Sequence, residues 1–131
     1  MTVRRGLAIM LSGVLGAAAL VQAPGAWAGD GEPAKDKTTC SASSTVKLRV
    51  QEQADGRLET VGIVWSDDDD WWDWKFKHDG DLSDEGSVKA KDADRSFRIV
   101  RTMVNFAGPD NVMFRAENRS TGEVCKIDLY Y

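Results

Sequence analysis

Four consecutive aspartates precede three closely spaced tryptophans in the segment 66–74, whose sequence is SDDDDWWDW. Ionised carboxylates so close together repel one another, so they need open water, a cation or basic neighbours. Carboxylate oxygens bind hard cations, and Ca²⁺ is the candidate ion here. Nothing in the sequence requires a cofactor. The spacing does not match the EF-hand loop and lacks its glycine, which leaves a solvated acidic loop as the alternative. The candidate metal ligands are Asp67, Asp68, Asp69 and Asp70.

The tryptophans of this segment do not all share one face of an extended chain. Trp72 and Trp74 have the parity of Phe76 and are expected in the core, whereas Trp71 has the opposite parity and is expected to be exposed. A sugar ring can stack on an exposed indole while neighbouring carboxylates accept its hydroxyl groups. Stacking of the indole on a lysine or arginine of the same chain is the alternative. The candidate ligand-binding residues are Trp71, Asp73, Asp69 and Asp70.

Catalytic groups are scarce. His78 is the only histidine, and at the end of a strand it is expected to be structural, so neither a nucleophilic triad nor a zinc site is indicated. A second oxygen-rich loop, 79–85, also lacks the glycine of a calcium loop. A glycosidase needs only two carboxyl groups, but a domain this small seldom has the deep cleft that would raise the pKa of one of them. We therefore expect no enzymatic activity and no catalytic residues.

Basic and acidic residues are unevenly distributed. Nine carboxylates lie between residues 67 and 85, while arginines concentrate after residue 94. Because a guanidinium group binds carboxylates bidentately, we expect these arginines to pair with the acidic loops. If the arginines and the acidic loops lay apart in space, the molecule would instead be a charge dipole that suits a partner with the opposite arrangement of charges. The arginines are Arg95, Arg98, Arg101, Arg115 and Arg119.

Residues 1–28 have the pattern of a secretory signal peptide, with Arg4 and Arg5 before an apolar stretch and Ala26-Trp27-Ala28 before the expected cleavage site. Glycines and polar residues dilute the apolar stretch, which makes a transmembrane helix the weaker interpretation. The arginine pair fits the twin-arginine export pattern only loosely. Cleavage changes the net charge from −4 to about −6, because it removes only those two charged residues. We therefore expect a secreted, extracellular protein that binds neither nucleic acid nor, after cleavage, a membrane.

Cys40 and Cys125 are the only cysteines. In an oxidising compartment an isolated pair predicts one disulfide rather than a metal site. A closed loop of about 85 residues would stabilise the fold by roughly 4–5 kcal/mol in the chain-entropy model.

The elements that must position these residues are short strands. Residues 29–39 are polar and expected to be disordered, whereas 40–131 form a single β domain with alternating apolar residues and turn signals such as Asp55-Gly56. Six or seven strands predict an all-β fold, a small antiparallel β-sandwich of immunoglobulin-like architecture, with a small β-barrel as the alternative. A parity change near Val100 predicts a β-bulge or a strand whose two halves are buried on opposite sides. The expected strands are 46–50, 58–65, 71–78, 88–90, 97–106, 112–116 and 125–129.

These features favour a secreted, non-enzymatic binding module that recognises an extracellular polysaccharide or protein through the segment 66–74. A secreted enzyme inhibitor or toxin-like effector, acting by protein–protein contact, is the alternative. The sequence leaves the oligomeric state open.

Overall fold

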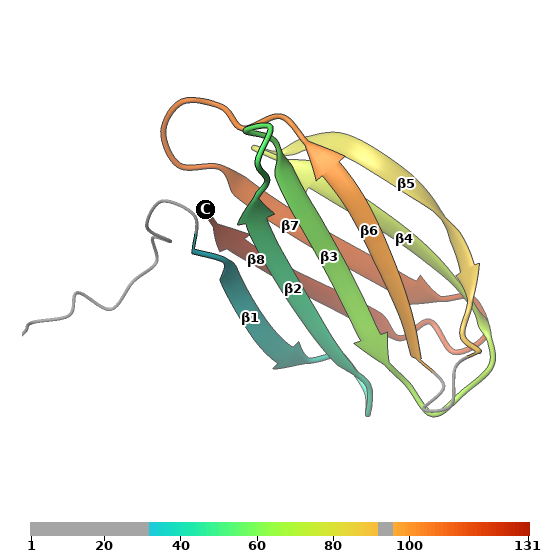
Figure 1. Cartoon of the computed structure of the whole chain (residues 1–131). Helices are drawn as coiled ribbons and strands as arrows, with labels where there is room; N and C mark the ends of the chain where they lie inside the picture. Colours follow the sequence, from blue (N-terminus) through green and yellow to red (C-terminus); the bar gives the residue numbers. More distant parts are fainter. Residues whose placement is uncertain (1–31, 92–95) are drawn as a thin grey trace, which may run out of the picture.

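Eight β-strands form two antiparallel four-stranded sheets in the computed structural model, which describes residues 32–91 and 96–131 (Figure 1). Sheet A has the strand order β1-β2-β3-β6 and sheet B the order β5-β4-β7-β8, and the described residues contain no helix. The predicted all-β sandwich is confirmed. The strands are β1 (Ala34–Thr39), β2 (Thr45–Glu52), β3 (Leu58–Trp65), β4 (Trp71–His78), β5 (Asp81–Lys89), β6 (Ser96–Met103), β7 (Asn111–Asn118) and β8 (Val124–Tyr130).

The core lies between the two sheets and takes every second residue of the central strands. On β4 the predicted parity is confirmed, because Trp72, Trp74 and Phe76 are buried. The Trp72 ring lies 5.6 Å from the ring of Phe97 on the opposite sheet. Fully buried Phe114 of sheet B lies against Gly62 of sheet A, where a Cβ would stand only 2.6 Å from the phenyl ring.

Two edge strands differ from the sequence-based expectation. Residues 34–39, expected to be disordered, form β1 and pair with β2 over six positions, and β5 is a full strand where only residues 88–90 were expected. Edge strands are held by backbone hydrogen bonds to one neighbour, and most side chains of these two remain exposed or half-buried. They therefore lack the apolar alternation by which a strand is recognised in a sequence.

The predicted irregularity in the strand after residue 96 was also misplaced. Val100 stays in register with Val61 and its side chain is exposed, and β6 ends at Met103, so Val104 and Phe106, which also suggested a change of parity, lie beyond the strand. The register shift occurs instead between β4 and β5, at Phe76 and Lys77.

Covalent and ionic links join the two sheets. The predicted disulfide is confirmed: Cys40, just after β1 of sheet A, is bonded to Cys125 in β8 of sheet B. On the other side of the sandwich, Arg101 of β6 pairs with Asp84 of β5. That ion pair holds the pKa of Asp84 below its usual value.

The expected signal peptide lies outside the described residues. The part of the chain that the structure describes contains no helix that is long and apolar enough to cross a membrane.

Candidate functional site

The aspartate run forms the corner between β3 and β4, and its side chains serve the fold. Asp68 Oδ1 accepts hydrogen bonds from the backbone N–H of Asp70 and from Trp72 Nε1, both at 3.0 Å. Asp70 Oδ2 accepts one from Asn118 Nδ2 at 3.1 Å. Asp67 and Asp69 are exposed. The run therefore anchors a buried indole and the end of β7, and two of the four predicted metal ligands are occupied by these hydrogen bonds.

Trp71 is exposed as predicted, with 48% of its surface accessible. The guanidinium carbon of Arg119 lies 5.7 Å from the centre of the indole, so the alternative of stacking within the chain is the one that occurs. Arg119 also binds both oxygens of Asp73, with a shortest contact of 2.8 Å, and Ser87 Oγ donates a hydrogen bond to the same carboxylate. These bonds lower the pKa of Asp73, Arg119 contributing most. The predicted ligand-binding carboxylate is thus already bonded within the chain.

A shallow depression of about 380 Å³ lies beside this cluster on the outer face of sheet B. Two carboxylates and two cations line it, so it offers no excess of either charge. Residue 86 must be glycine to make room for the buried indole beneath the sheet, because a Cβ there would stand 2.7 Å from Trp74 Cζ2. The lining residues are Asp73, Trp74, Lys75, Glu85, Gly86, Ser87 and Arg115.

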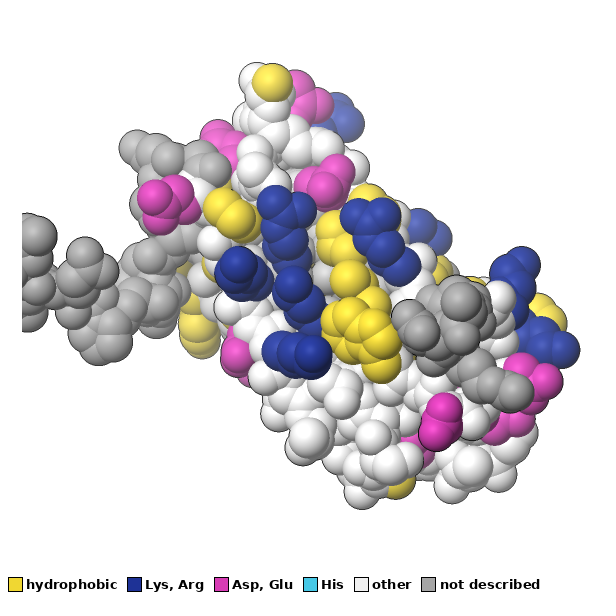
Figure 2. Space-filling view, turned by 60° about the horizontal axis from the view of Figure 1, so that its bottom comes forward, with side chains coloured by type: hydrophobic (Ala, Val, Ile, Leu, Met, Phe, Trp, Pro, Cys, Tyr) yellow, Lys and Arg dark blue, Asp and Glu magenta, His cyan; other side chains and the backbone are white. Residues whose placement is uncertain are grey.

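The outer face of sheet A carries a concentration of positive charge that the sequence analysis did not identify. The strand register sets Lys35 directly opposite Arg49 and Lys37 directly opposite Lys47, and Arg98 points outward from β6. Figure 2 looks onto this surface and shows a band of Lys and Arg side chains beside a band of hydrophobic ones. We call this surface the cationic face. Its five cations are Lys35, Lys37, Lys47, Arg49 and Arg98.

Within residues 32–91 and 96–131 these cations have no carboxylate partner, although Arg49 donates a hydrogen bond to Gln51 Oε1 at 2.6 Å. The ion pairs among the described residues involve none of the five. Asp36 lies between two of the lysines along β1, but alternation directs its side chain to the opposite face of the strand. Glu59 is the only acidic residue among the outward positions of the four strands, and its carboxylate accepts a hydrogen bond from Gln53. Like charges directly opposite each other destabilise a sheet, so this arrangement costs stability.

An apolar strip runs along β3 between the cations of β2 and Arg98. It consists of Val61, Ile63 and Trp65. Lys37 Nζ lies 4.6 Å from the centre of the Trp65 ring, at the distance of a cation–π contact. Val61 points outward and yet is only 3% exposed, whereas Ile63 and Trp65 are half-buried and keep part of their surface accessible. The cationic face is therefore a flat surface with an apolar centre and positively charged flanks.

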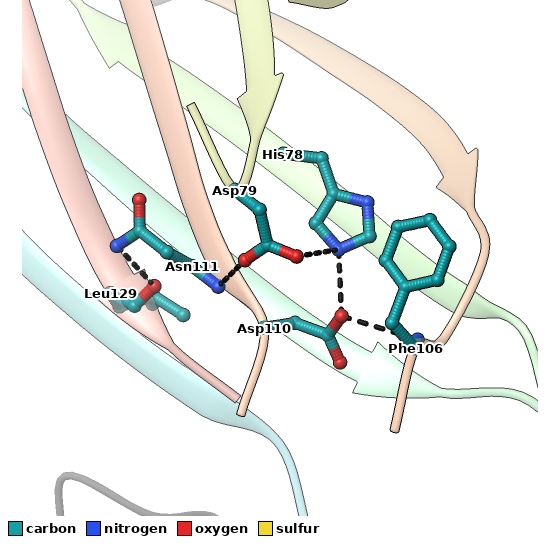
Figure 3. A network of polar contacts seen from close by, with 6 residues as sticks. All are labelled: His78, Asp79, Phe106, Asp110, Asn111 and Leu129. Carbon is teal, nitrogen blue, oxygen red and sulfur yellow. Dashed lines mark hydrogen bonds and ion pairs between the residues drawn. The ribbon is translucent and has the colours of Figure 1, made fainter. Parts of the chain in front are cut away.

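His78, at the end of β4, lies between two carboxylates (Figure 3). His78 Nε2 lies 2.7 Å from Oδ1 of fully buried Asp110 and 3.7 Å from Oδ2 of Asp79. Phe106 stacks on the imidazole, with ring centres 4.8 Å apart. We call His78, Asp79 and Asp110 the His78 cluster. Asp110 is 32 residues from His78 along the chain, so no sequence spacing indicated it.

Comparison with known proteins gives no match to a family model, a curated protein or a solved structure. The function is therefore argued from the surfaces and clusters described above.

Proposed function

We propose that this protein is a secreted, non-enzymatic binding module that holds an anionic extracellular polysaccharide on the cationic face of sheet A. The observation that carries the proposal is a set of five cations on one sheet face, none of them in an ion pair with another described residue, in a chain whose net charge is −4. The proposal moves the binding site away from the segment 66–74, where most of the predicted ligand groups are bonded within the chain.

The spacing of the cations suits a repeating polymer. Adjacent strands lie about 4.8 Å apart and alternate residues of one strand about 6.6 Å apart, so the cations of β1 and β2 occupy a block of roughly 5 by 7 Å. Arg98 lies two strands beyond Lys47, across the apolar strip, at roughly 10 Å. A flat face does not enclose a small ligand, but an extended chain with a carboxylate or phosphate on each repeat can contact several cations at once.

The apolar centre supports a polysaccharide. Trp65 and Ile63 provide hydrophobic surface on which the C–H faces of sugar rings can pack, while the flanking cations bind the acidic groups. The negative charge of the whole chain opposes the approach of any large polyanion at long range, so binding depends on the local contacts of the cationic face.

The test is binding of the mature protein to polygalacturonate, a polymer of sugar carboxylates, with neutral dextran as the control polymer. Lys47→Gln combined with Arg49→Gln removes two charges from the cationic face. Lys75→Gln combined with Lys126→Gln removes the same charge from the outer face of sheet B. Calorimetry should show binding by the wild type that weakens with salt, a loss of at least tenfold in the first variant, and a change of less than about twofold in the control, where tenfold corresponds to 1.4 kcal/mol.

Equal affinities for the two variants, or equal binding to dextran, would refute the proposal. Tight binding to one protein with no affinity for acidic polymers would favour the inhibitor or effector alternative. The Lys47→Gln and Arg49→Gln variant should also be more stable than the wild type by several tenths of a kcal/mol, because it relieves two like-charge pairs. That gain separates a loss of binding from a loss of folding.

A further inference from the structure

We infer that the His78 cluster binds a divalent transition-metal ion, with Zn²⁺ as the best match to its ligands. An imidazole nitrogen and two carboxylate oxygens are typical zinc ligands. In residues 32–91 and 96–131, three donor atoms of this kind meet within 4.8 Å of one another only at His78, Asp79 and Asp110. None of the three lies on the cationic face, so this inference stands independently of the proposed function.

The distances fit a common ion. Zinc bonds to nitrogen and oxygen are about 2.0–2.2 Å long, which places two ligands of a tetrahedral site roughly 3.4 Å apart. The distances from His78 Nε2 to Asp110 Oδ1 and Asp79 Oδ2, 2.7 and 3.7 Å, lie on either side of that value. Small rotations of the side chains would therefore bring the three donors around one ion, which would replace the proton in the hydrogen bond between His78 Nε2 and Asp110 Oδ1 and release it to solvent.

The carboxylates are already oriented by other groups. Asp79 Oδ1 accepts the backbone N–H of Asn111 at 2.9 Å, which turns Oδ2 toward the imidazole. The Asp110 backbone is fixed by two hydrogen bonds to Tyr131, and its Oδ1 also accepts the N–H of Phe106. Hydrogen bonds of this kind position the ligands of metal sites and raise their affinity. Folding has thus already fixed these side chains, so binding of an ion costs little additional conformational entropy.

The site can be reached from solvent and has room for further ligands. The side chain of Asp79 is 43% exposed, so an ion can enter along it, although Asp110 is fully buried. A shallow depression of about 320 Å³ adjoins the cluster on the side of His78 and is lined by Leu82, Val104 and Phe106 among others. Three protein ligands leave a fourth position for water. Ca²⁺ takes six to eight oxygen ligands, which makes it a poor match for one nitrogen and two carboxylates.

The experiment compares zinc binding by chelator-treated wild type, Asp79→Asn and Asp81→Asn. Asparagine keeps an oxygen for the Asn111 N–H and tolerates the left-handed backbone of Asp79, whose φ is 50°, so the first variant should fold. Asp81→Asn removes the same charge at the position directly opposite His78 in the β4–β5 pair, but it removes no donor atom of the cluster. Calorimetry with ZnCl₂ should show one saturable site in the wild type and in Asp81→Asn, and at least tenfold weaker binding in Asp79→Asn.

Thermal melts give a second readout. Zinc should raise the midpoint of the wild type, EDTA should reverse the rise, and Ca²⁺ at the same concentration should leave the midpoint unchanged. His78→Gln, compared with its own metal-free midpoint, should gain nothing from zinc. If His78→Gln fails to fold, the calorimetric comparison of Asp79→Asn with Asp81→Asn still tests whether the cluster binds zinc. Absence of saturable binding, equal affinities for Asp79→Asn and Asp81→Asn, or a response to Ca²⁺ alone would overturn the inference.

Discussion

Replacing the buried Glu123 should destabilise the fold by several kcal/mol, because its side chain holds a loop of the opposite sheet. Glu123 is buried, and its carboxylate holds the loop that carries Cys40. Oε2 accepts the backbone N–H groups of Ala42 and Ser44 at 3.0 and 2.9 Å, and Oε1 accepts the Ser44 hydroxyl at 2.6 Å. One side chain at the start of β8 thus satisfies three donors of the loop between β1 and β2.

The size of the loss follows from these bonds. A hydrogen bond to a charged group contributes about 1.5–3 kcal/mol, and a buried donor left without a partner costs about 1–3 kcal/mol. The Ala42 N–H is near the surface and water can replace its partner, so Glu123→Ala should cost about 3 kcal/mol rather than the full sum. Glu123→Gln keeps one acceptor and turns an amide toward the donors, which should cost about half as much.

Urea unfolding with the disulfide intact is the assay. For a domain of this size a loss of about 3 kcal/mol should lower the midpoint by at least about 1 M with little change in slope. Glu117→Ala is the matched control, because Glu117 forms an exposed ion pair with Arg115 and its loss should cost less than about 1 kcal/mol. If Glu123→Ala unfolded within about 0.5 kcal/mol of this control, the carboxylate would not be clamping the loop, and the reasoning would be wrong.

Three further predictions concern the core, the exposed indole and acid. Gly62→Ala should lower the free energy of unfolding by about 1–3 kcal/mol, because the added methyl group overlaps the buried Phe114 ring. An unchanged midpoint in urea titrations would contradict the packing of the two sheets. Trp71→Ala should cost less than about 1.5 kcal/mol, against about 3–5 for a buried tryptophan, and a larger loss would mean that the ring is packed. The lowered pKa values of Asp73 and Asp84 stabilise the fold at neutral pH, and this small contribution should fade as the pH falls from 3.8 through the folded-state values. Melts of Asp73→Asn should accordingly approach those of the wild type in acid, and a constant difference between them across this range would contradict the assignment.

The sequence predicted those parts of the fold in which one face of a strand is buried. The alternation around Trp72, Trp74 and Phe76 defines β4 and its inner face, and the isolated cysteine pair predicted the disulfide. The expected pairing of late arginines with acidic loops occurs for Arg101 and Arg119. Strands β1 and β5 were missed or shortened because neither has a buried residue, whereas the other two edge strands, β6 and β8, bury part of one face and were predicted.

The candidate sites depend on information that the sequence does not contain. Lys35 and Lys37 become part of a cationic face only through their register with Arg49 and Lys47, and β1 itself was not expected. The sequence shows the aspartate run only as a local concentration of charge. Hydrogen bonds from donors distant in the sequence, such as Asn118, give the run its structural role in the fold. Long-range pairing therefore decides which charges are free to bind a partner.

Mapping the bound polymer on the folded protein tests the proposed binding surface most directly. Backbone amide NMR spectra of the ¹⁵N-labelled mature protein would be recorded while polygalacturonate is added. We expect salt-dependent shifts concentrated on β1, β2 and the Arg98 end of β6, with the amides of Asp73 and Ser87 on sheet B unchanged. Shifts confined to the segment 66–74 and its neighbours on sheet B, with β1 and β2 unaffected, would contradict the assignment of binding to the cationic face.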